Sequence, residues 1–264
     1  MDLLLREKTA LITGSTAGIG FACARALAAE GARVVVNGRN AAHVERTVAA
    51  LRTTLPTANL QGMAADVGTA EGCARLCAAV PEVDILVNNA GIFARQDFFA
   101  TSDADWRHFY EVNVIAGVRL SRAYLPGMQA RGWGRVLFIS SESARNLPPD
   151  MLNYGVTKTA LLGLARGLAK RMAGTGITVN AILPGPTLTE GMASLLAEKT
   201  RSSGQSLEEA AAQFVQHARP SSILRRAARV DEVASLVAYV ASPLASATTG
   251  AALRVDGGVV DDIV

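Results

Sequence analysis

The stretch TGSTAGIG, residues 13–20, follows the short apolar run TALI and precedes the helix-like run FACARALAAEG, which Gly31 closes. This order predicts a buried strand, a glycine-rich loop and then a helix. The first turn of a helix has unpaired N–H groups and the positive end of its dipole, so a phosphate can rest there if no side chain blocks it. The loop therefore predicts a dinucleotide site, with a tight turn that binds nothing as the alternative.

Other short apolar runs rich in Val and Ile recur along the chain, at residues 33–37, 83–89, 134–140, 176–183 and 252–256. Longer helix-like stretches lie between them, at residues 43–55, 103–128 and 153–174. Continuous apolar strands that alternate with helices are typical of a parallel sheet covered on both faces. Right-handed crossovers then predict an α/β, doubly wound Rossmann fold of about seven strands, as a single domain over residues 1–264. The least regular stretch, residues 184–222, is predicted to be a mobile substrate lid.

Composition indicates a globular protein that acts on small molecules. Half of the 264 residues are hydrophobic and 19% are charged, and the net charge of +3 is spread along the chain, which disfavours nucleic acid or a membrane surface as partner. Its three cysteines and three histidines form no metal-ligand pattern, so no metal is expected. The sequence has neither a basic, apolar leader nor a run of about 18 apolar residues. We therefore expect a cytoplasmic protein.

The end of the second predicted strand bears on which dinucleotide binds. An acidic side chain there would hold the adenosine ribose and repel a 2′-phosphate. This chain instead has NGRN at residues 37–40, with Gly38 at the acidic position and Arg39 beside it. Because a guanidinium pairs well with phosphate, the sequence favours NADP(H) over NAD(H), with a solvated loop arginine as the alternative. Asp66 and the run NNAG, residues 88–91, follow the third and fourth predicted strands at the same edge of the sheet.

The strongest chemical signal lies further along the chain. The predicted strand GRVLFISSES ends in serines, and Tyr154 follows Ser141 by 13 residues, with Lys158 four residues later. Residues i and i+4 share one face of a helix, so the phenol and the ammonium can share one site. A nearby positive charge favours the phenolate and draws the pKa of tyrosine down from about 10. A half-buried tyrosine beside a solvated lysine is the alternative interpretation.

Six motifs in this order resemble the short-chain dehydrogenase/reductase family. They are TGSTAGIG, NNAG, Asn113 in EVNV, Ser141, YGVTK and PGPTLT. The similarity extends over nearly the whole chain, to the segment TGAALRVDGG, and it includes a general likeness to the family's 3-oxoacyl-carrier-protein reductase-like members. The resemblance also implies a homo-oligomer, a tetramer or dimer, with the tail VVDDIV either joining the interface or fraying.

The resemblance implies a catalytic tetrad. Tyr154 would give a proton to a carbonyl oxygen in reduction, or remove one from an alcohol in oxidation. Lys158 would lower the pKa of Tyr154 and hold the nicotinamide ribose. Ser141 would donate a hydrogen bond to the reacting oxygen, and Asn113 would hold a water that links Lys158 to solvent. Thr157 stands where serine is frequent, and we expect no consequence.

The resemblance also implies which residues bind the cofactor. They are Gly14, Ser15, Thr16, Gly18, Ile19, Gly20, Arg39, Asp66, Val67, Asn88, Asn89, Ala90, Gly91, Tyr154, Lys158, Pro184, Gly185, Thr187 and Thr189. Many NADP-using relatives carry a basic residue where this chain has Ala17. Phosphate recognition is therefore expected to rest on Arg39, with Ser15, Thr16 and Asn40 able to assist.

We expect an oxidoreductase that transfers a hydride between NADP(H) and a secondary alcohol or ketone. A dinucleotide-binding redox sensor without catalysis is the second hypothesis, although such relatives usually lose the tyrosine or the lysine. The substrate is left open. Its walls are expected from Phe93, Arg95, residues 142–152 and the stretch after Pro184. Arg145 would pair with a substrate anion, pair with Glu142, or be solvated.

Overall fold

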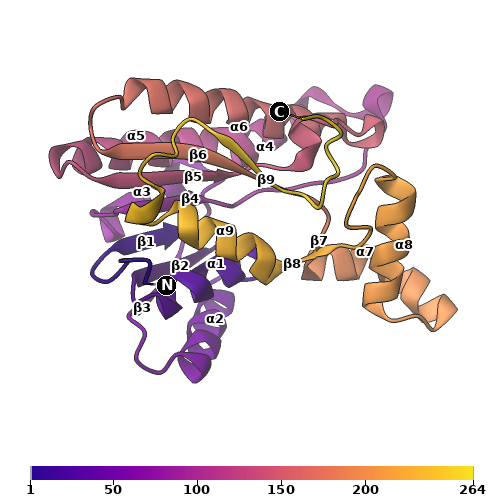
Figure 1. Ribbon diagram of the computed structural model, residues 1–264, viewed down its shortest axis with the longest axis horizontal. Coiled ribbons are helices and arrows are strands. Elements are labelled where there is room, and N and C mark those ends of the chain that lie inside the picture. Colours follow the sequence, from indigo (N-terminus) through magenta and orange to yellow (C-terminus); the bar gives the residue numbers. More distant parts are fainter. Residues whose placement is uncertain (1, 264) are drawn as a thin grey trace.

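A parallel β-sheet forms the middle layer of the computed structural model, which describes residues 2–263 (Figure 1). Within these residues the sheet has seven strands in the order β3-β2-β1-β4-β5-β6-β9, and every neighbouring pair is parallel. The strands are β1 (Thr9–Ile12), β2 (Arg33–Gly38), β3 (Leu60–Ala64), β4 (Ile85–Asn88), β5 (Gly134–Ile139), β6 (Ile177–Pro184) and β9 (Ala252–Val255). The predicted doubly wound sheet of about seven strands is confirmed.

Helices cover both faces of this sheet. One face carries α1 (Gly18–Ala29), α2 (Ala41–Thr54) and α9 (Val230–Val240), and the other carries α3 (Ala70–Ala79), α5 (Ala116–Ala130) and α6 (Leu152–Arg171). Successive strand residues serve opposite layers: Val34 and Val36 pack toward α1 and α2, whereas Val35 packs toward the other layer. Both faces are buried, and this is why the strands read as continuous apolar runs.

The predicted helix over residues 103–128 is interrupted in the structure. It consists of α4 (Asp103–Tyr110), a π-helical turn (Glu111–Ile115) and α5. The π turn contains Asn113, whose buried side chain bonds to a neighbouring loop. π turns are rare and occur often at functional sites. Their wider winding leaves no mark in hydrophobic periodicity, so the sequence predicted one unbroken helix.

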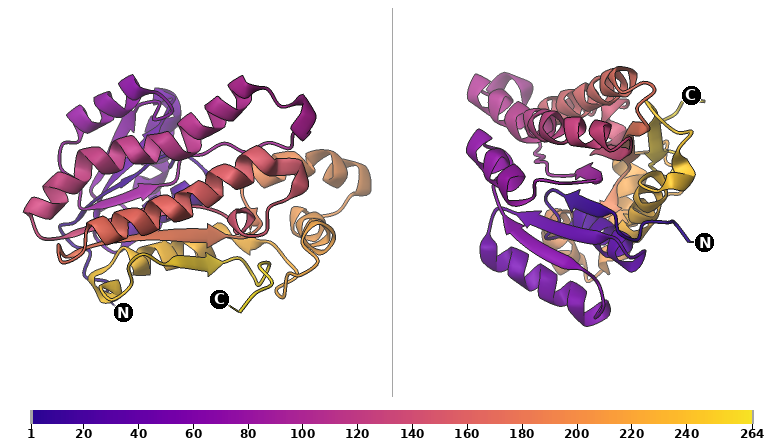
Figure 2. Two further views of the ribbon diagram at one scale, coloured as in Figure 1. Left: turned by 90° about the horizontal axis from the view of Figure 1, so that it is seen from above. Right: turned by 90° about the vertical axis from the view of Figure 1, so that its left-hand side faces the viewer.

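Residues 187–229 form a small unit of their own beside the main body, which we call the α7–α8 unit (Figure 2). It contains β7 (Thr187–Leu188), α7 (Glu190–Ser203), α8 (Leu207–Ala218) and β8 (Ala228–Arg229), with β7 and β8 paired. Its helices pack on a separate cluster that includes Met192, Leu196 and Val215. Much of the stretch that was expected to be irregular is therefore helical.

The order of the strands places a crevice at one edge of the sheet. From β1 the chain passes outward to β2 and β3, then returns to β4 on the other side of β1. Ligands of such sheets bind where this reversal separates the loops at the carboxyl ends of the strands. The loops after β1, β4, β5 and β6 all leave from this edge. Shorter 3₁₀ turns occur at Phe98–Ala100, Glu142–Ala144, Pro149–Met151 and Pro243–Ala245.

Candidate active site

The glycine-rich loop joins β1 to α1 as expected, and its glycines are needed for two reasons. Gly14 and Gly18 have φ angles of +61° and +56°, which favour glycine. A Cβ on Gly20 would lie 2.4 Å from the Nδ2 atom of Asn89 and from the carbonyl oxygen of Gly14. Gly20 is thus required in part because Asn89, in the NNAG segment, lies so close to it. Ala17 begins α1 without a side-chain cap, so the first N–H groups of the helix stay available to an anion.

Thr13 and Asn89 fasten the loops after β1 and β4 to each other. Thr13 Oγ1 accepts hydrogen bonds from the N–H groups of Asn89 and Ala90, both at 3.0 Å. Asn89 Nδ2 donates to the carbonyl oxygens of Thr13 and Gly14 at 2.9 and 3.0 Å. The side chain of Asn89 therefore holds the glycine loop in place. Thr13 is a site residue that the sequence analysis missed.

Asn37, also missed, makes a similar connection at the end of β2. Its Nδ2 atom donates to the carbonyl oxygens of Met63 and Ala65, both at 3.1 Å. Its own N–H donates to the hydroxyl of Ser15, which in turn donates to the carbonyl oxygen of Ile12. Ser15 is fully buried, so its hydroxyl cannot assist in phosphate recognition as expected.

The residues expected to recognise a 2′-phosphate are only partly free to do so. Asn40 Oδ1 accepts from the N–H of His43 and caps α2. Arg39 is exposed, and its guanidinium has no hydrogen bond or ion pair to another residue of 2–263. A Cβ at Gly38 would lie 2.6 Å from the methyl carbon of Thr16. The glycine loop itself therefore disfavours an acidic side chain at position 38.

Two of the residues expected at the adenosine pocket turn their side chains elsewhere. The side chain of Asn88 is buried toward Gly117, and neither its Oδ1 nor its Nδ2 has a hydrogen-bond partner among the described residues. The side chain of Val67 packs in the core below α3. These two residues can therefore line the pocket only with their backbones. Asp66 lies at the crevice edge, where its Oδ1 accepts from the N–H of Gly68 at 3.0 Å.

The PGPTLT segment links the crevice to the α7–α8 unit. A Cβ on Gly185 would lie 2.5 Å from the carbonyl oxygen of Asp256, so this glycine is required for packing. The hydroxyl of Thr187 donates to the carbonyl oxygen of Gly185. Thr189 caps α7 through the N–H of Met192, and its methyl group lies 3.3 Å from where a Cβ of Gly18 would be. Thr189 therefore brings the beginning of α7 against the glycine loop.

Tyr154 and Lys158 share one face of α6, as the spacing predicts. Lys158 Nζ lies 5.5 Å from the centroid of the Tyr154 ring and donates to the carbonyl oxygen of Ile139 at 2.9 Å. Burial lowers the pKa of Lys158 to about 8. Burial also raises the pKa of Tyr154 to about 12, although hydrogen bonding with Ser141 lowers it in part. The direction for Tyr154 is opposite to the expected one, because in this chain desolvation outweighs the favourable neighbours.

Asn113 connects the π turn to both the crevice and α6. Its Oδ1 accepts from the N–H of Ile92 at 2.8 Å, and its Nδ2 donates to the carbonyl oxygen of Ile92 and to the hydroxyl of Thr157. Thr157 donates in turn to the carbonyl oxygen of Tyr154 at 2.7 Å. The hydroxyl of Thr157, from which no consequence was expected, therefore takes part in this network.

Gly91 is where these groups converge. A Cβ on Gly91 would lie 3.3 Å from both Asn113 Oδ1 and Lys158 Nζ. The structure thus brings the loop after β4 together with the π turn and α6. Ser141, in the loop after β5, lies close enough to Tyr154 to lower the pKa of its phenol. The open glycine cradle, the uncapped start of α1 and the exposed Arg39 fit a dinucleotide that carries phosphates.

A cavity of about 770 Å³ lies between the loop that follows the turn at residues 142–144, the end of α8 and the C-terminal segment. It is lined by Arg95, residues 145–150, residues 217–221 and residues 260–262. The C-terminal segment is a wall that the sequence analysis missed. Three arginines of this region have carboxylate partners, in the pairs Arg95–Asp150, Arg145–Asp262 and Arg219–Glu142.

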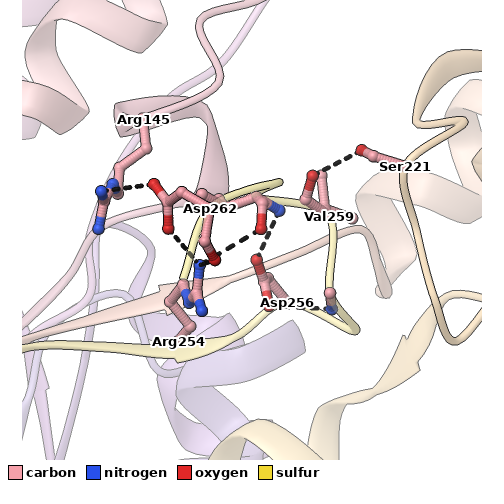
Figure 3. A network of polar contacts seen from close by, with 8 residues as sticks. Arg145, Ser221, Arg254, Asp256, Val259 and Asp262 are labelled. Atoms are coloured by element: carbon pink, nitrogen blue, oxygen red, sulfur yellow. Dashed lines mark hydrogen bonds and ion pairs between the residues drawn. The ribbon is translucent and has the colours of Figure 1, made fainter. Parts of the chain in front are cut away.

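The tail is folded back onto the protein (Figure 3). Asp262 bridges Arg145 and Arg254, and Ser221 donates to the carbonyl oxygen of Val259. Arg145 thus pairs with the tail rather than with Glu142. Val259 and Asp262 of the tail therefore have partners on the body, whereas Ile263 is exposed.

The fold and the site together define a class of protein: a nicotinamide dinucleotide-dependent oxidoreductase, with serine, tyrosine and lysine beside the crevice of a Rossmann fold. A family profile described as enoyl-(acyl carrier protein) reductase matches residues 14–260. The chain belongs to the short-chain dehydrogenase/reductase family.

Named relatives agree with this assignment. The chain is 47% identical over 263 residues to the uncharacterized oxidoreductase YvaG of Bacillus subtilis, with 100% of both chains covered. It is 37% identical to the dehydrogenase/reductase SDR family member 4 of Sus scrofa, covering 96% of this chain and 88% of that one. The crystal structure of L-sorbose reductase from Gluconobacter frateurii, complexed with NADPH and L-sorbose, superposes with a TM-score of 0.94 at 31% identity and covers 100% of both chains.

Within residues 2–263, no three His, Cys, Asp or Glu residues gather closely enough to hold a metal ion. Across the same residues, none of the helices combines the length and the apolar character needed to cross a bilayer.

Proposed function

We propose that this protein interconverts a secondary alcohol and a ketone with NADP(H), and that Tyr154 is its general acid and base. The observation that carries the proposal is the convergence at Gly91, which lies in the loop at the dinucleotide crevice. A Cβ at this position would lie 3.3 Å from both Asn113 Oδ1 and Lys158 Nζ, and Lys158 follows Tyr154 by one turn of α6. Ser141, in the loop after β5, lies beside the phenol of Tyr154 and lowers its pKa. The dinucleotide, when bound, supplies or accepts the hydride.

The protein's own residues would handle the proton and the charge on oxygen. Ser141 and Tyr154 direct hydroxyl groups to one point, where they can donate hydrogen bonds to a carbonyl oxygen as it gains negative charge. In reduction Tyr154 gives up its proton, and in oxidation it takes one from the alcohol. Lys158 is 5% exposed, and its positive charge beside the ring favours the phenolate. Asn113 and Thr157 act as positioning residues, because they fix the loop after β4 to the helix that carries Tyr154.

A preference for NADPH is supported by the end of β2. Arg39 is exposed, and Gly38 leaves no room for the carboxylate that would repel a 2′-phosphate. The superposed L-sorbose reductase carries NADPH. The 2′-phosphate of NADPH would place its charge beside a guanidinium that is free to form a bidentate pair.

The cavity lined by residues 145–150, 217–221 and 260–262 supports a neutral, hydroxylated substrate, such as a keto sugar. Its lining arginines are balanced by carboxylates, so it offers many donors and acceptors without one dominant charge. A substrate anion would have to displace one of these carboxylates. We also propose that the α7–α8 unit is the substrate lid, because residues 217–221 at its end form one side of the cavity.

A panel assay tests this function. NADPH and NADH oxidation are followed by absorbance with L-sorbose and other keto sugars, simple ketones, diketones and β-ketoacyl thioesters. We expect turnover with NADPH that is fastest among the hydroxylated ketones. Faster turnover of acyl thioesters would favour the 3-oxoacyl-carrier-protein reductase-like subtype instead, and tight NADPH binding without any turnover would favour a redox sensor.

A further inference from the structure

Glu142 directly follows Ser141, yet its side chain is buried. Only 4% of the side chain is exposed, and its Oε1 accepts from Arg219 Nε at 2.8 Å. Its Oε2 is also buried and has no hydrogen-bond partner among the described residues. A buried carboxylate with one oxygen unsatisfied is costly, so Arg219 is its principal compensation.

The two partners come from different parts of the molecule. Glu142 lies in the 3₁₀ turn after β5, whereas Arg219 follows the last residue of α8 in the α7–α8 unit. The side chain of Arg219 is 13% exposed and also donates to the carbonyl oxygen of Ala218. The unit also contacts the body elsewhere, where Leu224 N–H donates to the carbonyl oxygen of Gly257 and Ser221 donates to that of Val259. The ion pair therefore connects the unit to the loop that begins at the catalytic serine.

Both charges act on the phenol of Tyr154, with opposite signs. Glu142 raises the pKa of Tyr154 and Arg219 lowers it. The other groups around this phenol are the hydroxyl of Ser141, Lys158 on α6 and the edge of the Phe93 ring. Glu142 itself also faces Ser143 of its own turn and the carboxylate of Asp256 after β9, and burial raises its pKa while Arg219 lowers it.

We propose that the Glu142–Arg219 ion pair is a latch: it fastens the α7–α8 unit to the loop that carries Ser141 and balances the charge beside the Tyr154 hydroxyl. When the unit lies against the body, Arg219 neutralises the carboxylate. When the unit moves away, an uncompensated carboxylate is left beside the acid and base. The position of the α7–α8 unit thereby controls the charge beside Tyr154, and with it the ability of Tyr154 to act as acid and base. The consequence for catalysis rests on the proposed function of Tyr154. The electrostatic effect of Glu142 and Arg219 on the Tyr154 phenol does not depend on that function.

A tyrosinate titration tests the latch without a substrate. The near-ultraviolet absorbance of each protein with bound NADP⁺ is titrated against the same protein carrying Tyr154→Phe, so that the difference reports Tyr154 alone. We expect Glu142→Gln to lower the midpoint by about one pH unit, and Arg219→Gln to raise it by a similar amount. The double variant should return close to the wild-type midpoint, because both charges are gone.

The outcomes separate this inference from its alternatives. Shifts of both single variants in the same direction, or no shift in either, would overturn it. Arg226→Gln serves as the matched control, because it breaks the ion pair between Arg226 of the unit and Glu232 of α9, away from Tyr154, and should leave the midpoint unchanged. If Arg219→Gln fails to fold, Glu142→Gln and the double variant still decide the matter. If the midpoints shift as expected but Tyr154→Phe keeps its turnover, the proposed function fails and the electrostatic effect stands.

The latch also has a mechanical consequence. Amide hydrogen exchange over residues 190–218, measured with NADPH bound, should rise at least about fivefold in both single variants and much less in Arg226→Gln. Unchanged exchange in Glu142→Gln and Arg219→Gln would show that the pair does not fasten the unit, and the latch would be rejected.

Discussion

Arg39 stands alone at the end of β2, and cofactor choice depends on it at the scale of one residue. Replacing it with serine removes the guanidinium while leaving the backbone of the loop unchanged. We expect the KM for NADPH to rise about tenfold or more, since a charge-assisted contact to phosphate contributes about 1.5–3 kcal/mol. The KM for NADH should change less than about twofold. Arg122→Ser, an exposed arginine on α5, is the control. Equal losses with both cofactors would contradict the assignment.

Lys158 gives a second prediction at this scale, about the pH dependence of stability. Its pKa is about 8 in the folded protein, against 10.5 for the ordinary side chain. Between these values the unfolded chain holds the proton and the folded protein does not, so this lysine makes the free energy of unfolding rise with pH. Urea unfolding should show wild type gaining about 2 kcal/mol over Lys158→Met between pH 7.5 and 9.5. Lys170→Met, exposed on the same helix, should follow wild type, and parallel curves for all three would refute the shift.

At the scale of elements, the α7–α8 unit differs from the layers around the sheet. Its interior is the small cluster around Met192, Leu196 and Val215, whereas β4, β5 and β6 are buried on both faces. Few buried contacts permit local opening at low free energy. Residues 190–218 of the wild-type protein should exchange their amide hydrogens at least about tenfold faster than β5. Equally slow exchange in both would show that the unit is not a lid.

The π turn shows why some elements could not be predicted. Periodicity identified the helices on both sides of Asn113, but it is insensitive to one wider turn within a helix. The turn matters to the site because it carries Asn113, whose side chain bonds to Ile92 and Thr157. Element type was therefore predictable here, and local winding was not.

At the scale of the whole molecule, the doubly wound sheet of about seven strands and the position of the crevice were predictable. Short apolar runs between helices limit a chain to few topologies, and a glycine loop after the first strand fixes the binding edge. The contacts between distant segments were not predictable. The Glu142–Arg219 pair joins residues 77 apart, and Arg145 finds Asp262 at a separation of 117. Ser15 and Asn88 carry suitable side chains, but only the folded structure reveals that they turn inward.

The most direct test of the central claim is the turnover of Tyr154→Phe beside Tyr239→Phe, an exposed tyrosine on α9. The change removes one hydroxyl and keeps the ring, so NADPH binding should persist. With the fastest ketone of the panel, we predict that kcat falls at least about a hundredfold in Tyr154→Phe, because general acid–base groups contribute about 10²–10⁴-fold. Tyr239→Phe should match wild type. A Tyr154→Phe protein that binds NADPH and keeps wild-type turnover would contradict the assignment of Tyr154 as the acid and base.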